Sequence, residues 1–360
     1  MPVNLALGHV SNDFLIAALV IYSLSVVAFA GDFAFGRPRR ADASAGAPQA
    51  QDRAAALAGV GAASRTAPAV AGQDPQTAAA AADGEGPGGT DSMPELAVSG
   101  LRAIRQAGTW VQAAVALSSV GVVAHTVAVV TRGLAVHRAP WGNMYEFVTA
   151  LTCVAAIFFL YAMIRYRAWT LGVFVMGAVV VALGLAETLI YTAAGQLVPA
   201  LQSYWLDIHV TAMTLATGIF FVAAVLGVVY LTVDRYARRA AAGRAVPDNA
   251  IVRRLPTIEQ LDRLTYRTIM FGFPVWTFGV IAGAIWADKA WGRYWGWDPV
   301  ETWAFITWVL YAAFLHARAT AGWRGRRAHY IQLLGFTSLI FNILVVQVFI
   351  AGLHSYAGVS

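Results

Sequence analysis

The chain has one stretch that is unusually rich in tryptophan, Trp286–Trp303, with the sequence W-A-D-K-A-W-G-R-Y-W-G-W-D-P-V-E-T-W. Five of the chain's twelve tryptophans and one tyrosine fall within it: Trp286, Trp291, Tyr294, Trp295, Trp297 and Trp303. A packed core does not need so many indoles, because Leu and Val fill space without an N–H that requires a partner. The density indicates a surface for a large, flat, mostly apolar ligand. The alternative is an interfacial aromatic belt, since Trp and Tyr gather where a bilayer meets water.

The end of this stretch predicts the start of a helix. Asp298 precedes Pro299, and Glu301 follows three residues after Asp298. Asp at the N-cap, Pro at the first helical position and Glu at the third form a capping box. We therefore expect a helix from Pro299, with Asp298 and Glu301 also fixing the tryptophan segment against the membrane.

The composition predicts an all-α integral membrane protein with a bundle of about eight transmembrane helices. Of 360 residues, 59% are hydrophobic and 12% are charged, and the mean hydropathy is +0.61. Soluble domains carry about 25% charged residues. Eight apolar runs are long enough to span a bilayer: Val10–Ala30, Thr109–Thr131, Tyr145–Ile164, Thr170–Tyr191, Tyr204–Leu231, Ile269–Ala287, Pro299–Ala317 and Tyr330–Leu353.

These runs divide the chain into five parts. We expect a first transmembrane helix (1–30), a disordered Ala-, Gly- and Pro-rich linker (31–108), helices two to five (109–231), a basic loop (232–268), and helices six to eight with the tryptophan-rich segment 286–303 (269–360). In the basic loop, Thr257 and Gln260 form a second capping box, which predicts a short amphipathic helix on the membrane surface.

The distribution of basic residues predicts the orientation. All but four of the 25 Lys and Arg residues follow the first, third, fifth or seventh run, the exceptions being Arg132, Arg138, Lys289 and Arg293. The positive-inside rule places the rich side, with the linker, in the cytoplasm, and both termini and the tryptophan segment outside the cell. The pI near 9.6 does not indicate nucleic-acid binding, because these residues form no dense basic strip. One cysteine, Cys153, excludes dithiol chemistry and a covalent c-type haem.

Two of the seven histidines fall at the depth of the tryptophan segment. His209 lies about one turn inside the fifth run, and His354 lies at the end of the eighth. Ionisable groups within spans are functional candidates, and two imidazoles beside an aromatic surface suit the axial positions of a haem iron. The alternative is a pair of interfacial histidines that bond to water.

The remaining histidines are at other depths. His316 lies seventeen residues after Pro299, about 25 Å from the tryptophan segment, so it either binds iron at a second position or is an interfacial histidine beside Arg318. We expect His125 and His137 to be packed or solvated rather than to line a path. His9 and His329 are expected to be solvated loop residues.

Several segments of the chain resemble those of a known family. W-G-R-Y-W-G-W-D-P-V-E-T-W is similar to the tryptophan-rich (WWD) motif of the CcsA/ResC family, the haem-handling proteins of system II cytochrome c biogenesis. The likeness extends to H-R-A-P-W-G-N-M-Y-E-F (137–147), L-Q-S-Y-W-L-D-I-H-V (201–210), F-L-H-A-R (314–318) and G-L-H-S-Y-A-G (352–358), in family order.

The resemblance implies roles for individual residues. His209 and His354 would ligate haem b at the outer face of a bacterial cell membrane, and His316 would bind it on its way outward. The second ligand at His316 would come from a separate ResB-type partner. The haem-binding residues implied are Trp286, Trp291, Tyr294, Trp295, Trp297, Asp298, Glu301, Trp303, His209, His316 and His354.

The sequence thus favours a protein that guides haem across the membrane and presents it for thioether attachment to apocytochrome c. The reactive carbons belong to the haem, and no nucleophile or general base is assigned, so it stays open whether the chain is itself an enzyme or the haem-delivery subunit of a cytochrome c synthase. Two other classes remain: a transmembrane b-type cytochrome, which needs histidine pairs at matching depths, and a haem-independent permease.

Overall fold

The computed structural model of the chain describes residues 3–35, 102–195, 203–244, 255–320 and 322–354. These residues belong to one compact unit, Met1–Gly36 with Ala97–Ser360. Most of the expected linker, 31–108, lies outside the described residues. Its first five residues continue the first helix, which therefore extends beyond the expected boundary at residue 30.

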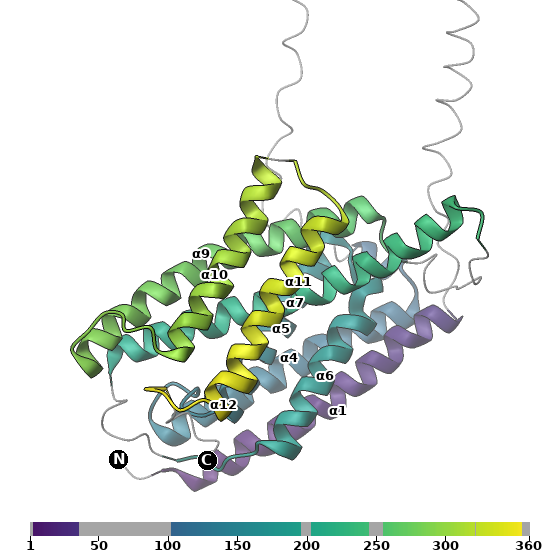
Figure 1. The fold of residues 1–360 in the computed structure, drawn as a ribbon. Helices are drawn as coiled ribbons and strands as arrows, with labels where there is room; N and C mark the ends of the chain where they lie inside the picture. The colour runs from purple at the N-terminus through teal and green to yellow at the C-terminus, as the bar shows by residue number, and fades with distance from the viewer. Residues whose placement is uncertain (1–2, 36–101, 196–202, 245–254, 321, 355–360) are drawn as a thin grey trace, which may run out of the picture. The chain divides into compact units, whose positions relative to one another are not determined.

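The described part of the chain is helical, with no strand (Figure 1). Eight helical segments are long and apolar enough to cross a membrane, which confirms the predicted fold class. They are α1 (Leu5–Phe35), α4 (Thr109–Val136), α5 (Met144–Tyr166), η2 (Trp169–Leu171) with α6 (Gly172–Leu189), α7 (Tyr204–Ala241), α9 (Ile258–Trp291), α10 (Pro299–Ala319), and α11 (Arg326–Phe341). The last one continues through a π-helical turn, η4 (Asn342–Val346), into α12 (Gln347–Phe349).

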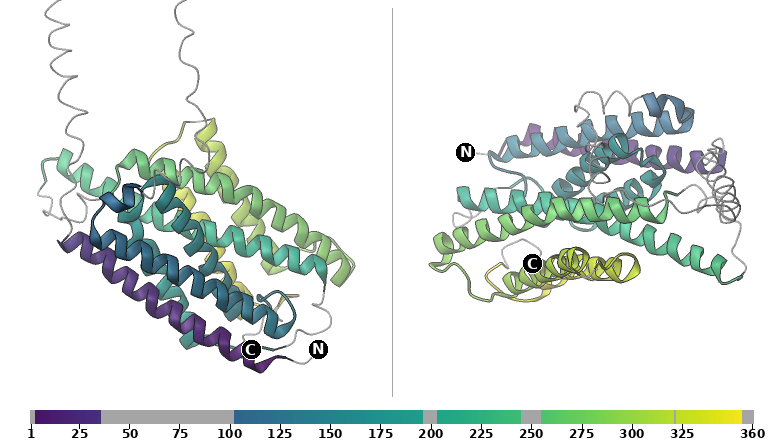
Figure 2. Two further views of the ribbon diagram at one scale, coloured as in Figure 1. Left: turned by 180° about the vertical axis from the view of Figure 1, so that it is seen from behind. Right: turned by 90° about the horizontal axis from the view of Figure 1, so that it is seen from above.

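The helices pack as neighbouring pairs around α7. The closest pairs are α1 with α4, α7 with α9, and α10 with α11. Seen from above, α7 and α9 lie between the α1–α4 pair and the α10–α11 pair (Figure 2). Because α7 is the central helix, it contributes to two apolar cores, with Val222 and Leu226 facing one and Phe220 and Ala223 facing the other.

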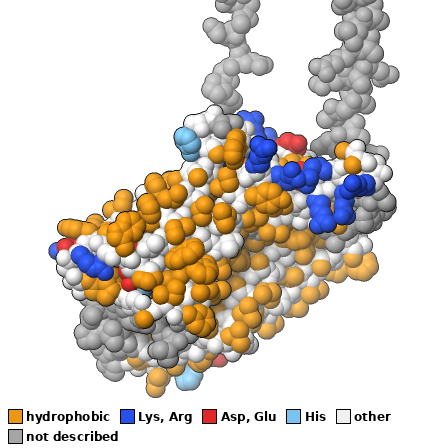
Figure 3. Space-filling view, viewed as in Figure 1, with side chains coloured by type: hydrophobic (Ala, Val, Ile, Leu, Met, Phe, Trp, Pro, Cys, Tyr) orange, Lys and Arg blue, Asp and Glu red, His pale blue; other side chains and the backbone are white. Residues whose placement is uncertain are grey.

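Apolar and basic side chains occupy different parts of the surface. Large apolar side chains are exposed along the helices, as a lipid environment requires, and Lys and Arg gather at one end of the face seen in Figure 3. We call that end, which carries Arg235–Arg239 and Arg318–Arg327, the basic end. The opposite end, which carries Trp286–Trp303, is called the tryptophan end.

Both predicted capping boxes are present, at Thr257 and at Asp298. The surface helix that we expected after Thr257 is not separate, however. It forms the first turns of α9, which continues without a break into the membrane span. The chain between Leu264 and Ile269 contains no glycine or proline that would end a helix, and even Pro274 lies within α9.

The expectation that His329 is a solvated loop residue is wrong. Its side chain is 1% exposed, its ring stacks on Tyr230 at 3.7 Å between centroids, and its Nε2 lies 3.2 Å from the Asp262 carboxylate. Arg318 donates to the same carboxylate at 2.6 Å. Helix α11 begins at Arg326, so His329 lies within its first turn and is covered by α7. His125 is packed, as expected, against Tyr22.

Candidate functional site

The connection between α9 and α10 is held by Glu301. Helix α9 ends at Trp291, and Gly292 takes the left-handed conformation (φ 69°) that ends it. From the first turn of α10, the Glu301 carboxylate accepts the N–H groups of Gly296 at 2.9 Å and Asp298 at 3.1 Å. The tryptophan-rich connection is thus fixed relative to α10 by backbone hydrogen bonds.

Asp298 connects the start of α10 to the C-terminal segment. Its carboxylate accepts from the N–H of Val300 at 3.1 Å, from the N–H of Leu353 at 2.7 Å and from Nδ1 of His354 at 2.8 Å. Burial raises the pKa of the Asp298 carboxyl, but the hydrogen bonds from His354, Leu353 and Val300 outweigh burial and hold the pKa below its usual range. Asp298 is therefore a charged anchor for His354 as well as a helix cap.

His209 is anchored in a similar way on α7. Its Nδ1 lies 2.8 Å from the carbonyl oxygen of Gly279 on α9. A Cβ on Gly283, one turn further along α9, would lie 2.5 Å from the same Nδ1. The absence of a side chain at Gly283 therefore lets the imidazole lie directly against the α9 backbone.

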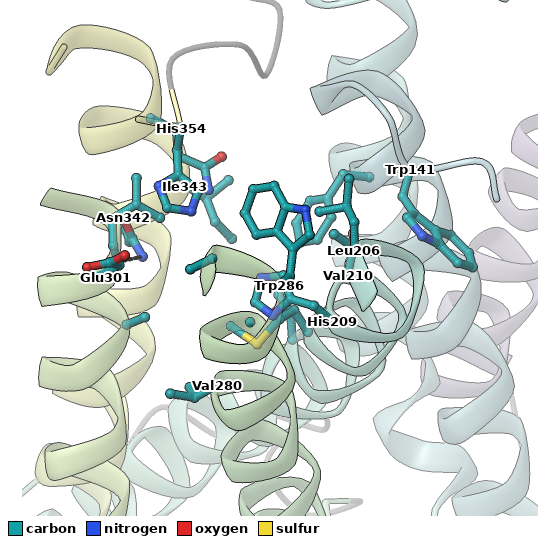
Figure 4. Close-up of a pocket in the computed structure, with 18 of the residues that line it drawn as sticks. Trp141, Leu206, His209, Val210, Val280, Trp286, Glu301, Asn342, Ile343 and His354 are labelled. Atoms are coloured by element: carbon teal, nitrogen blue, oxygen red, sulfur yellow. Dashed lines mark hydrogen bonds between the residues drawn. The ribbon is translucent and has the colours of Figure 1, made fainter. Parts of the chain in front are cut away.

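Both imidazoles lie beside one indole. The ring of His209 is parallel to that of Trp286, with centroids 6.4 Å apart, and the ring of His354 is edge-on to Trp286 at 6.1 Å. Trp291 contacts the same group, at 5.1 Å from His354 and 4.7 Å from Trp286. Two histidines 145 residues apart in sequence therefore share one aromatic group at the tryptophan end (Figure 4).

The anchoring determines which ring nitrogen carries the lone pair. A carbonyl oxygen and a carboxylate can only accept, so Nδ1 of both histidines donates. A neutral imidazole with its proton on Nδ1 carries its lone pair on Nε2. A metal-ligating histidine normally has its second nitrogen bonded to a carbonyl or carboxylate in this way. An Nε2 lone pair of this kind is the donor that histidine offers to a haem iron.

These side chains line a cavity of about 180 Å³ (Figure 4). Sites for drug-sized ligands usually measure about 300–1,000 Å³, so the cavity must widen before it accommodates a porphyrin. The cavity lining also includes Met213, Asn342 and Gln347, which the sequence did not single out, and Trp141 and Asn143, which the sequence indicated only as part of the segment 137–147. A π-helical turn at Asn342 is a feature often found at functional sites, but a single sequence does not reveal it.

A buried ion cluster supports the wall of the cavity before α5. Glu146 accepts from Arg132 at 3.1 Å, from Arg138 at 2.8 Å and from the N–H of Gly142 at 2.9 Å. The Glu146 side chain is fully buried. Because Gly142 and its neighbour Trp141 line the cavity, this cluster fixes the position of the wall opposite the tryptophan-rich connection.

The other candidate residues divide into two groups. Tyr294 and Trp295 line the cavity, as does Glu301. Trp297, which is 65% exposed, lies outside the cavity lining and packs edge-on against Trp295, while Trp303 packs against Phe341. His316 lies near the far end of α10 with its side chain exposed, away from this cavity.

The region that contains this cavity is similar to known proteins. The family model for the cytochrome C assembly protein covers residues 141–354. A cytochrome c biogenesis protein CcsA from Heterosigma akashiwo is 35% identical over 245 residues, covering 60% of this chain and 76% of the relative. The CcsA protein of Gloeobacter violaceus is 34% identical over 293 residues, covering 68% and 86%.

A solved structure titled Cytochrome c Heme Lyase CcmF has a similar fold, with a TM-score of 0.50 and 20% sequence identity, covering 69% of this chain and 44% of that chain. At this identity the likeness concerns the fold alone. The family match runs from Trp141 to His354, which are also the first and last residues that line the cavity. The chain belongs to the cytochrome c assembly protein family, among its CcsA proteins.

Proposed function

We propose that this protein acts in c-type cytochrome biogenesis by binding haem at the tryptophan end and presenting it to an apocytochrome c. One observation carries the proposal: His209 and His354, each with Nδ1 bonded to an acceptor, lie beside the same indole in one cavity. The relatives named cytochrome c biogenesis protein CcsA support the same assignment.

The chemistry asks little of the chain beyond binding and orientation. Haem bound here supplies vinyl groups, and each cysteine thiol of an acceptor C-x-x-C-H adds S–H across one C=C bond, with no net oxidation or reduction. His209 and His354 hold and orient the iron, and the aromatic side chains exclude water from the porphyrin. Orientation and proximity are the contribution of the protein.

Binding requires a change at Trp286. The side chain is 1% exposed and lies within 6.4 Å of both imidazole centroids. A metal–imidazole bond is about 2 Å long, as at zinc sites, so two histidines that share an iron flank it closely. Trp286 therefore moves aside as haem enters, while the exposed Tyr294 and Trp297 lie where an acceptor protein approaches.

His316 supports a second haem position and a partner. It is exposed on α10, near the opposite end of the helix from the cavity at the tryptophan end. We propose that a ResB-type membrane partner supplies the opposing ligand and that haem moves from there to the cavity. The basic end then faces the cytoplasm of a bacterial cell, with the haem-presenting cavity outside.

The test is the absorption spectrum of the full-length protein purified with its partner and loaded with haem. His209→Ala and His354→Ala should each weaken haem binding at the cavity at least about tenfold, and added imidazole should restore it by replacing the lost ligand. His137→Ala, at the exposed end of α4, is the matched control. Unchanged haem affinity in both variants would contradict the proposal, and so would a wild-type complex that binds no haem.

A further inference from the structure

The basic end contains a second, larger cavity that the proposed function does not use. It lies between the last turns of α7 and the first turns of α11 and has a volume of about 500 Å³. Its polar lining comes from both helices: Thr232, Arg235, Tyr236, Arg238, Arg239, Arg326 and Tyr330. Figure 3 shows Lys and Arg side chains gathered at this end of the molecule.

Among the residues that the structure describes, most of the positive charge around this cavity has no ion-pair partner. Arg238 forms an ion pair with Asp234, 2.9 Å between Nε and Oδ2, and half of its side chain is exposed. Arg235, Arg239 and Arg326 form no ion pair with any residue that the structure describes. Clustered like charges repel one another, so a bound anion would stabilise this arrangement.

The same cavity is apolar on its membrane side. Val228 and Leu231 line it, one to two turns before Arg235 on α7. Val228, Arg235 and Arg239 are spaced by seven and four residues, which places them on one face of the helix. Along about 16 Å of that face, the lining changes from aliphatic to cationic. A ligand that matches it is an amphiphile with an anionic head.

We propose that this cavity binds the phosphate-bearing headgroup of an anionic phospholipid. Guanidinium groups bind phosphate oxygens in bidentate geometry, and tyrosines are favoured at the level of the headgroups. Arg235 comes 31 residues after Tyr204, the first residue of α7, and so lies about 46 Å along the helix, whereas a bilayer with its headgroups is about 40–45 Å thick. The part of α7 around Arg235 therefore lies at the headgroup level, where basic pockets between helices bind anionic lipids.

General charge bias alone does not account for this site. The positive-inside rule requires basic residues in a loop, but it does not require arginines from two separate helices to line one cavity. The volume of about 500 Å³ falls within the range of ligand sites, and it exceeds that of the cavity at the tryptophan end. The site thus offers shape as well as charge.

The experiment is native mass spectrometry of the full chain in detergent, titrated with dioleoylphosphatidylglycerol, with dioleoylphosphatidylcholine or with inorganic phosphate. The wild type should retain one phosphatidylglycerol about tenfold more tightly than phosphatidylcholine, and phosphate should not displace it. The double variant R235Q/R239Q should lose this preference. The double variant R324Q/R327Q removes the same charge from the same end but not from the cavity lining, so it should keep the preference.

Three outcomes would overturn the proposal. They are equal retention of phosphatidylglycerol by wild type and R235Q/R239Q, equal losses in R235Q/R239Q and R324Q/R327Q, and displacement of the lipid by inorganic phosphate, which would assign the site to a free anion. If R235Q/R239Q fails to fold, Arg326→Gln serves instead, because this exposed side chain reaches the cavity from the other helix. An unchanged lipid preference in that variant would also overturn the proposal.

Discussion

The two ends of the molecule contain the same chemical pair in different surroundings. At the tryptophan end, Asp298 binds His354 at 2.8 Å, and at the basic end Asp262 binds His329 at 3.2 Å. Asp262 also binds Arg318, and His329 is covered by the ring of Tyr230. Asp298 is instead held by backbone N–H groups.

The difference shows how one pair serves two purposes. At the basic end, Arg318 also binds Asp262 and Tyr230 stacks on His329, so this histidine is buried and connects α7, α9, α10 and α11. At the tryptophan end, backbone N–H groups also bind Asp298, and the ring of His354 lies at a cavity lined by tryptophans. We infer that the first pair stabilises the fold and the second orients a ligand, and the predictions below separate the two.

The largest effect is expected at the basic end. Asp262→Ala leaves Arg318 and His329 without their carboxylate in a largely buried site, which should reduce the free energy of unfolding by about 3 kcal/mol. The measurement is denaturant unfolding in detergent, beside haem affinity at the tryptophan end, which should be unchanged once the protein is folded. A loss of haem affinity in folded Asp262→Ala would show that the two pairs are not separate in function.

At the tryptophan end, Asp298→Asn should act on the ligand. The amide keeps the shape of the side chain but removes the charge that makes His354 more basic, so haem affinity should fall by about 10–100-fold. Haem titration followed by absorbance measures this, with Asp262→Asn as the matched control. Equal haem affinity in Asp298→Asn and wild type would reduce Asp298 to a helix cap.

Trp286→Ala should open the cavity at that end. The indole of Trp286 then no longer has to move aside before haem enters. The association rate of haem should rise by about tenfold, because the conformation in which the indole closes the cavity is no longer populated. Stopped-flow absorbance provides the rate, and Trp303→Ala, which changes a ring outside the cavity lining, is the control. Slower association would mean that Trp286 attracts haem rather than excluding it.

The smallest expected effect is on the stability of the protein at acidic pH. The folded state holds the pKa of Asp298 below that of the unfolded chain, so its contribution to stability is complete above about pH 4, the usual value for Asp, and is lost as pH falls through the folded pKa. The unfolding midpoint of wild type should therefore fall more steeply below pH 4 than that of Asp298→Asn. Asp288→Asn, in the same segment, should follow the wild type.

Much of the fold could be predicted because its signals are local. Apolar runs gave the eight spans, and the capping boxes at Thr257 and Asp298 gave two helix starts to the residue. The surface helix was misjudged because its amphipathic pattern is also that of a long helix leaving the membrane. Nothing within a few residues of Thr257 distinguishes these cases.

The site could be predicted only in part because its decisive contacts are distant in sequence. The tryptophan segment and the depth of His209 and His354 follow from position along the chain. The bond between Asp298 and His354 joins residues 56 apart, and that between Asp262 and His329 joins residues 67 apart. His329 was expected in solvent, whereas packing against Tyr230 of α7, 99 residues earlier in the chain, determines its burial.

The π-helical turn at Asn342–Val346 has a consequence for the orientation of the C-terminal segment. A wider turn takes up one residue more than an α-helical turn, and each residue of an α-helix rotates the chain by about 100°. Whatever follows Val346 is therefore rotated by roughly that angle relative to an uninterrupted α11. One inserted residue thus sets the side of the helix axis from which Gln347, the first residue after the turn, extends into the cavity lining.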